Sequence, residues 1–104
     1  MSKYLVHFRV NPSAWPSDPA QVAEIWERAI AGGIHLLDQG LFEQIGWVSG
    51  LEGYGLVEAG SKAGVMELVT GFYPLFSQDI MEFTPHPEAG KAIVAGAKMA
   101  AGSS

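Results

Sequence analysis

The first strand-like segment of the chain, residues 3–10, alternates between apolar and polar side chains. Apolar residues occupy every second position from Tyr4 to Val10, and His7 and Arg9 lie between them. A period of two is typical of a β-strand with one buried face. We therefore expect the Tyr4 side to carry a helix and the His7 side to meet a pocket, a partner subunit or water.

A proline-containing loop follows, in which we expect Trp15 to be exposed, and the spacing then becomes helical. Asp18 is placed to cap a helix that starts at Pro19. Apolar residues recur every three or four positions over residues 22–37, and Gly40 is suited to end the helix. The pattern predicts one long amphipathic helix between Asp18 and Gly40.

Two adjacent glycines, Gly32 and Gly33, stand in the second half of this predicted helix. Each costs about 1 kcal/mol of helix stability relative to alanine. We interpret the pair as a kink or as a close contact with the sheet. The alternative is that the missing side chains leave space for a ligand between helix and sheet.

The rest of the chain predicts three more strands and two more helices. We expect strands at 42–49 and 54–59 joined by a turn at 50–53, a helix at 61–72 capped by Ser61, a strand at 80–84 and a helix at 88–100. The order β-α-β-β-α-β is the ferredoxin-like pattern, usually with sheet order 4-1-3-2 and both helices on one face. We therefore predict a single α+β domain over residues 1–104 with an extra C-terminal helix.

The balance of charge and hydrophobicity adds an expectation about assembly. Charged residues make up 16% of the chain and hydrophobic residues 48%, whereas ordinary soluble domains carry about 25% charged residues. So few charges leave too little polar surface for an isolated small domain, and a sheet with helices on one face leaves the other bare. We therefore predict a homo-oligomer.

Charge sign and residue usage exclude several other classes of protein. The formal net charge of -5 disfavours nucleic acid as a partner. The chain contains no cysteine, so thiolate metal sites are excluded and a reducing compartment is favoured. No segment approaches the ~20 apolar residues of a membrane span, and the N-terminus does not read as a signal peptide. We expect a cytoplasmic protein without a membrane partner.

A stretch near the end of the chain resembles a known family. It comprises Tyr73-Pro74-Leu75-Phe76, then Asp79-Ile80-Met81-Glu82, then His86-Pro87. This turn, strand and exit are similar to those of the muconolactone isomerase-like family. The resemblance implies a dimeric α/β barrel and a group of isomerases and cofactor-free monooxygenases. Residues 29–34 hold no acid or base and Trp47 stands where a basic residue is expected, so the chain is diverged from the true muconolactone isomerases.

The predicted sheet order brings together a candidate set of acid–base groups. If Met81 and Phe83 lie under the helices with the Tyr4 face, the opposite face gathers His7, Arg9, Tyr54, Glu58 and Glu82. A histidine beside carboxylates suits proton transfer, so we assign catalytic roles to His7, Glu58 and Glu82. Arg9 is suited to bind an anionic oxygen. The alternative is an ion-paired dimer seam or barrel interior without catalysis.

Aromatic residues near the ends of the elements predict a ligand pocket. We assign substrate-binding roles, with Arg9, to Trp47, Tyr54, Tyr73, Phe76 and His86. The three histidines show no metal-ligand spacing, so we expect no metal, and no cofactor motif is present. Two functions fit: a cofactor-independent enzyme moving a proton on an aromatic-derived, lactone or polyketide-like compound, or a non-catalytic oligomeric ligand-binding or scaffold protein. The first requires a pocket that a titratable group reaches.

Overall fold

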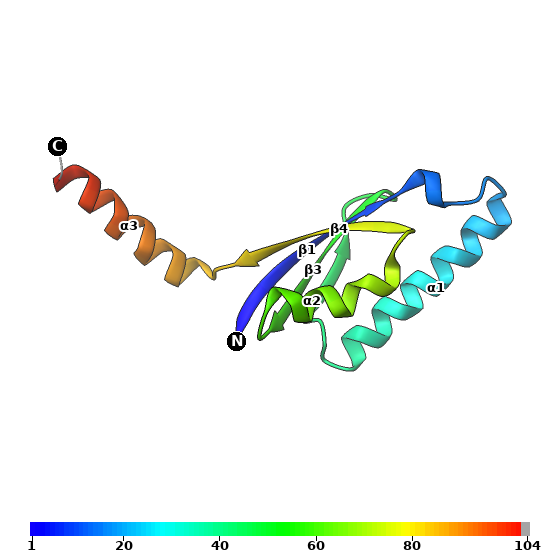
Figure 1. The fold of residues 1–104 in the computed structure, drawn as a ribbon, viewed down its shortest axis with the longest axis horizontal. Coiled ribbons are helices and arrows are strands. Elements are labelled where there is room, and N and C mark those ends of the chain that lie inside the picture. The colour runs from blue at the N-terminus through cyan, green and yellow to red at the C-terminus, as the bar shows by residue number, and fades with distance from the viewer. Residues whose placement is uncertain (103–104) are drawn as a thin grey trace.

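The structure, a computed structural model, describes residues 1–102 and joins a four-stranded antiparallel sheet to three α-helices (Figure 1). The elements are β1 (Ser2–Val10), α1 (Pro19–Asp38), β2 (Gln44–Trp47), β3 (Glu52–Ala59), α2 (Lys62–Val69), β4 (Phe76–Phe83) and α3 (His86–Gly102), with short 3-10 turns η1 (Pro12–Ala14) and η2 (Thr70–Phe72). This order confirms the predicted α+β class and is compatible with a ferredoxin-like fold.

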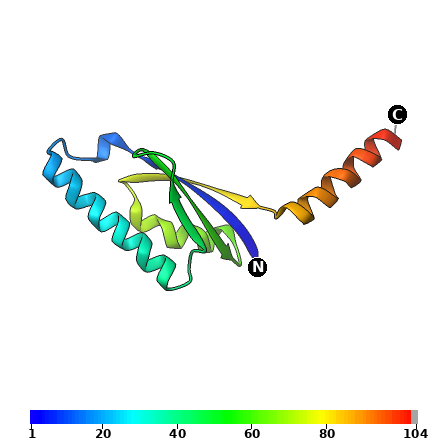
Figure 2. The ribbon, with the colours of Figure 1, turned by 180° about the vertical axis from the view of Figure 1, so that it is seen from behind.

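The strands lie in the order β2-β3-β1-β4, which is the predicted order read from the other edge. α1 and α2 both cover the same face of this sheet, as the view from behind also shows (Figure 2). Between helices and sheet lies a core in which every second side chain of β1 is buried. The buried residues are Tyr4, Val6, Phe8, Phe42, Val57, Ala59, Val65, Val69 and Phe76. α1 contributes no fully buried residue and packs through half-buried ones.

Local signals at the helix ends are confirmed in part. The Ser61 hydroxyl accepts a hydrogen bond from the Gly64 amide at 3.1 Å, as an N-cap should. Gly40 adopts a φ of 71° just beyond α1, a conformation that glycine tolerates best. The predicted side-chain cap by Asp18 was wrong, because Asp18 makes no cap hydrogen bond.

Several predicted boundaries were wrong by a few residues. β2 is shorter than 42–49, and the turn occupies 48–51, so that β3 begins at Glu52. β4 begins at Phe76 rather than at Ile80. Trp15 is half-buried rather than exposed, because its indole N–H donates to the Leu75 carbonyl at 2.7 Å and its ring packs on neighbouring aromatic side chains.

The predicted facing of β4 was also wrong. Tyr4 pairs with Glu82, and opposed residues of antiparallel strands point to the same face, so Glu82 lies on the helix-covered side. Met81 and Phe83 therefore lie on the opposite face, with exposed fractions of 45% and 42%. The phase of β4 is set by Phe76, which is buried in the core, and every second residue from it points toward the helices.

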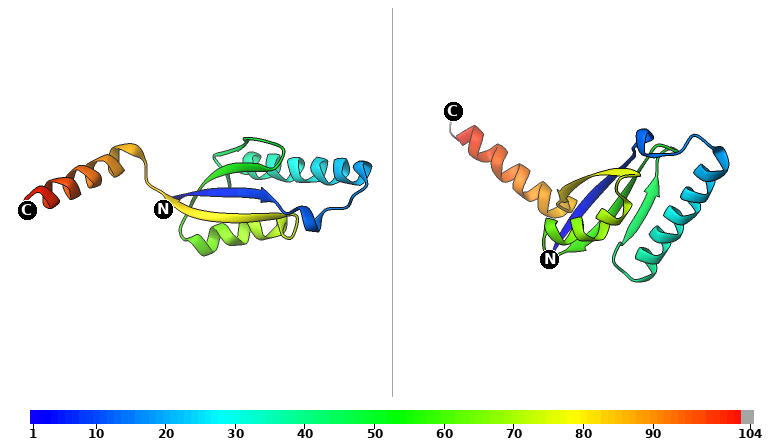
Figure 3. Two further views of the ribbon diagram at one scale, coloured as in Figure 1. Left: turned by 90° about the horizontal axis from the view of Figure 1, so that it is seen from above. Right: turned by 45° about the vertical axis from the view of Figure 1, so that its right-hand side comes forward.

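The last helix stands apart from this body. α3 follows β4 after two residues and extends beyond the end of the sheet, away from α1 and α2 (Figures 1 and 3). None of its residues is buried. The face of the sheet that α1 and α2 leave uncovered is called the open face below.

Candidate functional site

The open face carries four cross-strand rows of side chains from β3, β1 and β4. Two rows are polar, one is apolar and one is mixed, and each is fixed by the strand register. The rows are Glu52–Arg9–Ser77, Tyr54–His7–Asp79, Leu56–Leu5–Met81 and Glu58–Lys3–Phe83.

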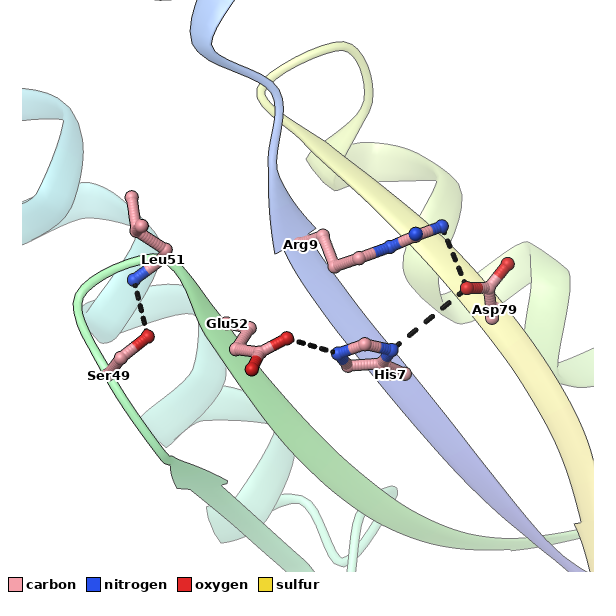
Figure 4. A network of polar contacts seen from close by, with 6 residues as sticks. All are labelled: His7, Arg9, Ser49, Leu51, Glu52 and Asp79. Atoms are coloured by element: carbon pink, nitrogen blue, oxygen red, sulfur yellow. Dashed lines mark hydrogen bonds and ion pairs between the residues drawn. The ribbon is translucent and has the colours of Figure 1, made fainter.

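His7 is held on the open face by Glu52. Its Nε2 lies 2.9 Å from Oε2 of Glu52 on the neighbouring strand (Figure 4). An ionised carboxylate only accepts hydrogen bonds, so this contact places a proton on Nε2. In the neutral imidazole, Nδ1 then keeps its lone pair and is free to take a proton.

Arg9 and Asp79 stand on the other side of the same imidazole. The Arg9 guanidinium donates to Oδ2 of Asp79 at 2.8 Å, and that oxygen lies 4.0 Å from His7 Nδ1 (Figure 4). Asp79 therefore holds the guanidinium close to the basic nitrogen. Both Arg9 and Asp79 are about half exposed, so the ion pair adds little stability, on the order of 0–1 kcal/mol.

Tyr54 supports the imidazole from the side. Its ring stacks on His7 with centroids 4.5 Å apart and an interplanar angle of 7°. Stacking and the Glu52 contact together restrict the ring orientation, and the His7 side chain is 17% exposed. A proton acceptor beside a fixed cation is an arrangement suited to abstracting a proton and stabilising the resulting anion.

The structure brings together some of the residues that the sequence assigned to a site and separates the others. His7, Arg9 and Tyr54 form one cluster on the open face. Trp47 and Phe76 lie on the opposite, helix-covered side of the sheet. The remaining residues are elsewhere: Glu82 on the helix-covered side, Tyr73 exposed in the turn before β4, His86 at the start of α3, and Glu58 at the far end of the open face.

Glu58 shares the open face with His7 but interacts with another group. It pairs across the strands with Lys3, whose ammonium donates to Glu43 at 2.9 Å. The hydrogen bond to Glu43, reinforced by the charges of Glu43 and Glu58, raises the pKa of Lys3 above the ordinary lysine value of 10.5. The carboxylate of Glu58 thus acts on the Lys3 ammonium rather than on the His7 imidazole.

Two carboxylates of the His7 cluster were missed by reasoning from the sequence. Glu52 falls in the predicted turn 50–53 and Asp79 just before the predicted strand 80–84, so neither is assigned a face from the sequence. The pairing of β1 with β3 could have identified Glu52, because extending β3 backward puts Glu52 opposite Arg9. Starting β4 at Phe76 puts Asp79 directly opposite His7.

A separate cavity of about 220 Å³ lies between α1 and the helix-covered side of the sheet. Its walls contain only aliphatic and aromatic side chains and one glycine. They are Phe8, Ala29, Ile30, Gly33, Ile34, Leu36, Leu37, Ile45, Trp47, Phe72 and Phe76. We call this cavity the apolar pocket.

The apolar pocket depends on the loose packing of α1. Gly33 faces β2, where an added Cβ would meet the Cδ1 of Ile45 at 3.6 Å. Ile30 and Ile34, both of which are well exposed, border the pocket where it opens to solvent. Only Gly33 of the glycine pair lines the pocket, and a Cβ added at Gly32 would meet the Phe72 ring at 3.7 Å, an ordinary packing contact. The pair therefore fits close packing of α1 at these two positions, and space for a ligand stays a prediction.

Neither a metal centre nor a membrane span is found in the part of the chain that the structure describes. Within residues 1–102, no three acidic or histidine side chains gather as metal ligands would. The helices of the same residues are too short or too polar to traverse a bilayer.

Comparison with known proteins adds no assignment. The chain matches no protein-family model, and no curated protein is similar to it.

Proposed function

We propose that the protein binds a small, neutral, largely aromatic or lactone-like molecule in the apolar pocket. One observation carries this proposal, namely a cavity of about 220 Å³ whose walls hold no ionisable side chain. Small-molecule sites are concave and mostly apolar, and they are usually formed before the ligand arrives. An apolar cavity of about 150 Å³ accommodates benzene, so this pocket has room for a single substituted ring.

The position of the acid–base cluster favours binding over chemistry in this pocket. Phe8 points into the pocket, and its neighbours His7 and Arg9 point to the other face of β1. Successive side chains of a strand project to opposite faces, so the sheet separates a ligand in the pocket from the imidazole. A ligand bound there has no proton acceptor among the side chains that line it.

A binding experiment with matched variants tests the proposal. Naphthalene and toluene serve as probes, and binding is followed by tryptophan fluorescence and by calorimetry. Gly33→Leu should fill the pocket and weaken binding at least about tenfold, the equivalent of 1.4 kcal/mol. Ala31→Leu adds the same side chain to the exposed side of α1 and should leave affinity unchanged. Equal affinity in all three proteins, or no binding of either probe, would refute the proposal.

A second candidate function rests on the His7 cluster and on the resemblance to the muconolactone isomerase-like family. In this proposal the protein is a cofactor-independent isomerase acting on the open face. Nδ1 of His7 takes an acidic proton from carbon, Glu52 holds the imidazole, and Arg9 binds the enolate oxygen that forms. The observation that favours it is the 2.9 Å contact between His7 and Glu52 beside the guanidinium of Arg9.

Proton exchange distinguishes this second candidate from simple binding. Muconolactone, a butenolide acid, is incubated with the protein in D₂O, and loss of its ring proton signals is followed by NMR. His7→Ala should lower exchange at least about a hundredfold, as for loss of a general base. His35→Ala, at an exposed position on α1, is the control. A fully active His7→Ala protein would refute the mechanism, whatever the pocket binds.

The assembly that we propose is a homodimer in which the open faces of two chains meet, as in a dimeric α/β barrel. Its support is the apolar row Leu56–Leu5–Met81, which crosses the open face and in which Met81 is 45% exposed. The low charge content supports the same assembly. We further propose a cytoplasmic location, with no nucleic-acid or membrane partner. Light scattering that finds a stable monomer at micromolar concentration would contradict the dimer.

A further inference from the structure

α3 is a largely exposed helix in the part of the chain that the structure describes, residues 1–102. It spans 17 residues, none of them buried, and Ile93 near its middle is 70% exposed. Isolated helices of this length are marginal in water. The glycines at 90 and 96 lower helix stability further, each by about 1 kcal/mol relative to alanine. A helix of this composition needs a surface to pack on.

The shape of the chain shows how much surface is left over. The radius of gyration is 17.7 Å, whereas about 13 Å is typical of a domain of this length. The accessible surface is 6955 Å² for a mass of 11.1 kDa, which exceeds that of a compact monomer by about 1,300 Å². A stable protein–protein interface buries roughly 800 Å² on each partner. The excess is therefore enough for one interface of ordinary size.

The side chains of α3 divide into two sides. Glu88, Lys91 and Lys98 project from one side of the helix, because three- and seven-residue spacings return to the same face. Ala89, Ile93 and their successors at residues 97 and 100 project from the other side, which holds no charge. We call this second side the charge-free face of α3. A helix that is apolar along one stripe is built to bury that stripe.

We infer that the charge-free face of α3 packs on a second copy of the chain, the copy seated on the open face, so that each subunit clasps the other. This inference rests on the proposed pairing of open faces. α3 leaves the body at the end of β4, away from α1 and α2, and only Thr84 and Pro85 separate it from Phe83 of the open face (Figure 1). Phe83 of the mixed row Glu58–Lys3–Phe83 lies between the apolar row and α3, so the open face continues along β4 into the helix. A closed two-fold dimer buries this surface twice, once from each subunit.

Full-length variants test the clasp against the pairing of the sheets. Ile93→Glu places a charge on the charge-free face of α3, Ala95→Glu places the same charge on its charged side, and Met81→Glu places it in the apolar row. The dimer dissociation constant of each is measured by analytical ultracentrifugation, with circular dichroism to verify folding. Ile93→Glu and Met81→Glu should each weaken the dimer at least about tenfold, whereas Ala95→Glu should change it less than about threefold.

The outcomes separate the two ideas. Loss of affinity in Met81→Glu but not in Ile93→Glu would overturn the clasp and leave the pairing of open faces intact. Wild-type affinity in both variants would overturn the clasp and also the pairing of open faces. Hydrogen exchange gives a second measurement in unmodified protein, since backbone amides of α3 should be protected in the dimer and lose protection on dilution. Fast exchange of α3 in the concentrated wild-type dimer would overturn the clasp.

Discussion

Phe76 is the side chain whose removal should damage the fold most. It opens β4, is 2% exposed, and packs between α1 and the sheet. Its ring lies within 5.6 to 6.2 Å of four other aromatic rings, measured between centroids. Those rings belong to Trp15 after η1, Trp26 of α1, Trp47 of β2 and Phe72 of η2.

The expected loss for Phe76→Ala combines a transfer term and a cavity term. Full burial of a phenylalanine side chain stabilises a protein by about 1.5–3 kcal/mol. The deletion leaves roughly 100 Å³ of space, which at ~24 cal/mol per Å³ adds about 2.4 kcal/mol if the site does not collapse. Phe76 already borders the apolar pocket, so the new space joins an existing void. We therefore expect a loss of about 4–5 kcal/mol.

Urea unfolding followed by tryptophan fluorescence measures this loss, at a fixed protein concentration because the proposed dimer would add to stability. Tyr73→Ala is the matched control, since Tyr73 is an aromatic residue of the same turn but is 69% exposed. It should change the unfolding free energy by less than about 0.5 kcal/mol, as should His35→Ala on the exposed side of α1. Comparable losses at Phe76 and His35 would show that the facing of α1 is wrong.

Two further predictions follow from close contacts. Gly55→Ala should cost about 1–3 kcal/mol, because a Cβ there would lie 2.5 Å from the buried Phe42 ring, whereas Gly46→Ala, with open space around it, should be neutral in the same urea assay. The folded pKa of Lys3 is raised, so its contribution is complete below the ordinary value of 10.5 and is lost as pH rises through the folded pKa. Thermal melts should therefore show a weaker alkaline loss of stability in Lys3→Met than in the wild type, and equal slopes would argue against the Glu43 contact.

Much of the fold follows from the sequence because its signals are local. Alternation in β1, the cap at Ser61 and the glycine beyond α1 each act within a few residues, and all three are observed. The facing of β4, in contrast, is set by a contact between residues far apart in the sequence. Ile80 and Met81 are adjacent apolar residues, so alternation alone fits either phase, and the burial of Phe76 against α1 makes the choice.

The candidate site was harder to predict because it depends on cross-strand register. The sequence identifies His7, Arg9 and Tyr54 correctly as neighbours, since β1 and β3 were assigned to the right faces. Of the two carboxylates that contact them, Glu52 is the first residue of β3, and Asp79 lies in the half of β4 that the predicted strand 80–84 leaves out, so both depend on boundaries that are least certain. A shift of two residues at the start of β3 decides whether Glu52 belongs to a turn or faces the imidazole.

The two candidate functions use opposite faces of β1, so substitutions can test them separately. Phe8 lines the apolar pocket, and His7 belongs to the cluster on the open face, although the two residues are adjacent. A substitution of His7 removes an exposed polar network while leaving the pocket walls in place. A cavity-filling change at Gly33 acts on the pocket from α1 and does not touch the open face. A ligand whose affinity responds to Gly33→Leu and not to His7→Ala is therefore held in the pocket, and a reaction with the opposite response takes place on the open face.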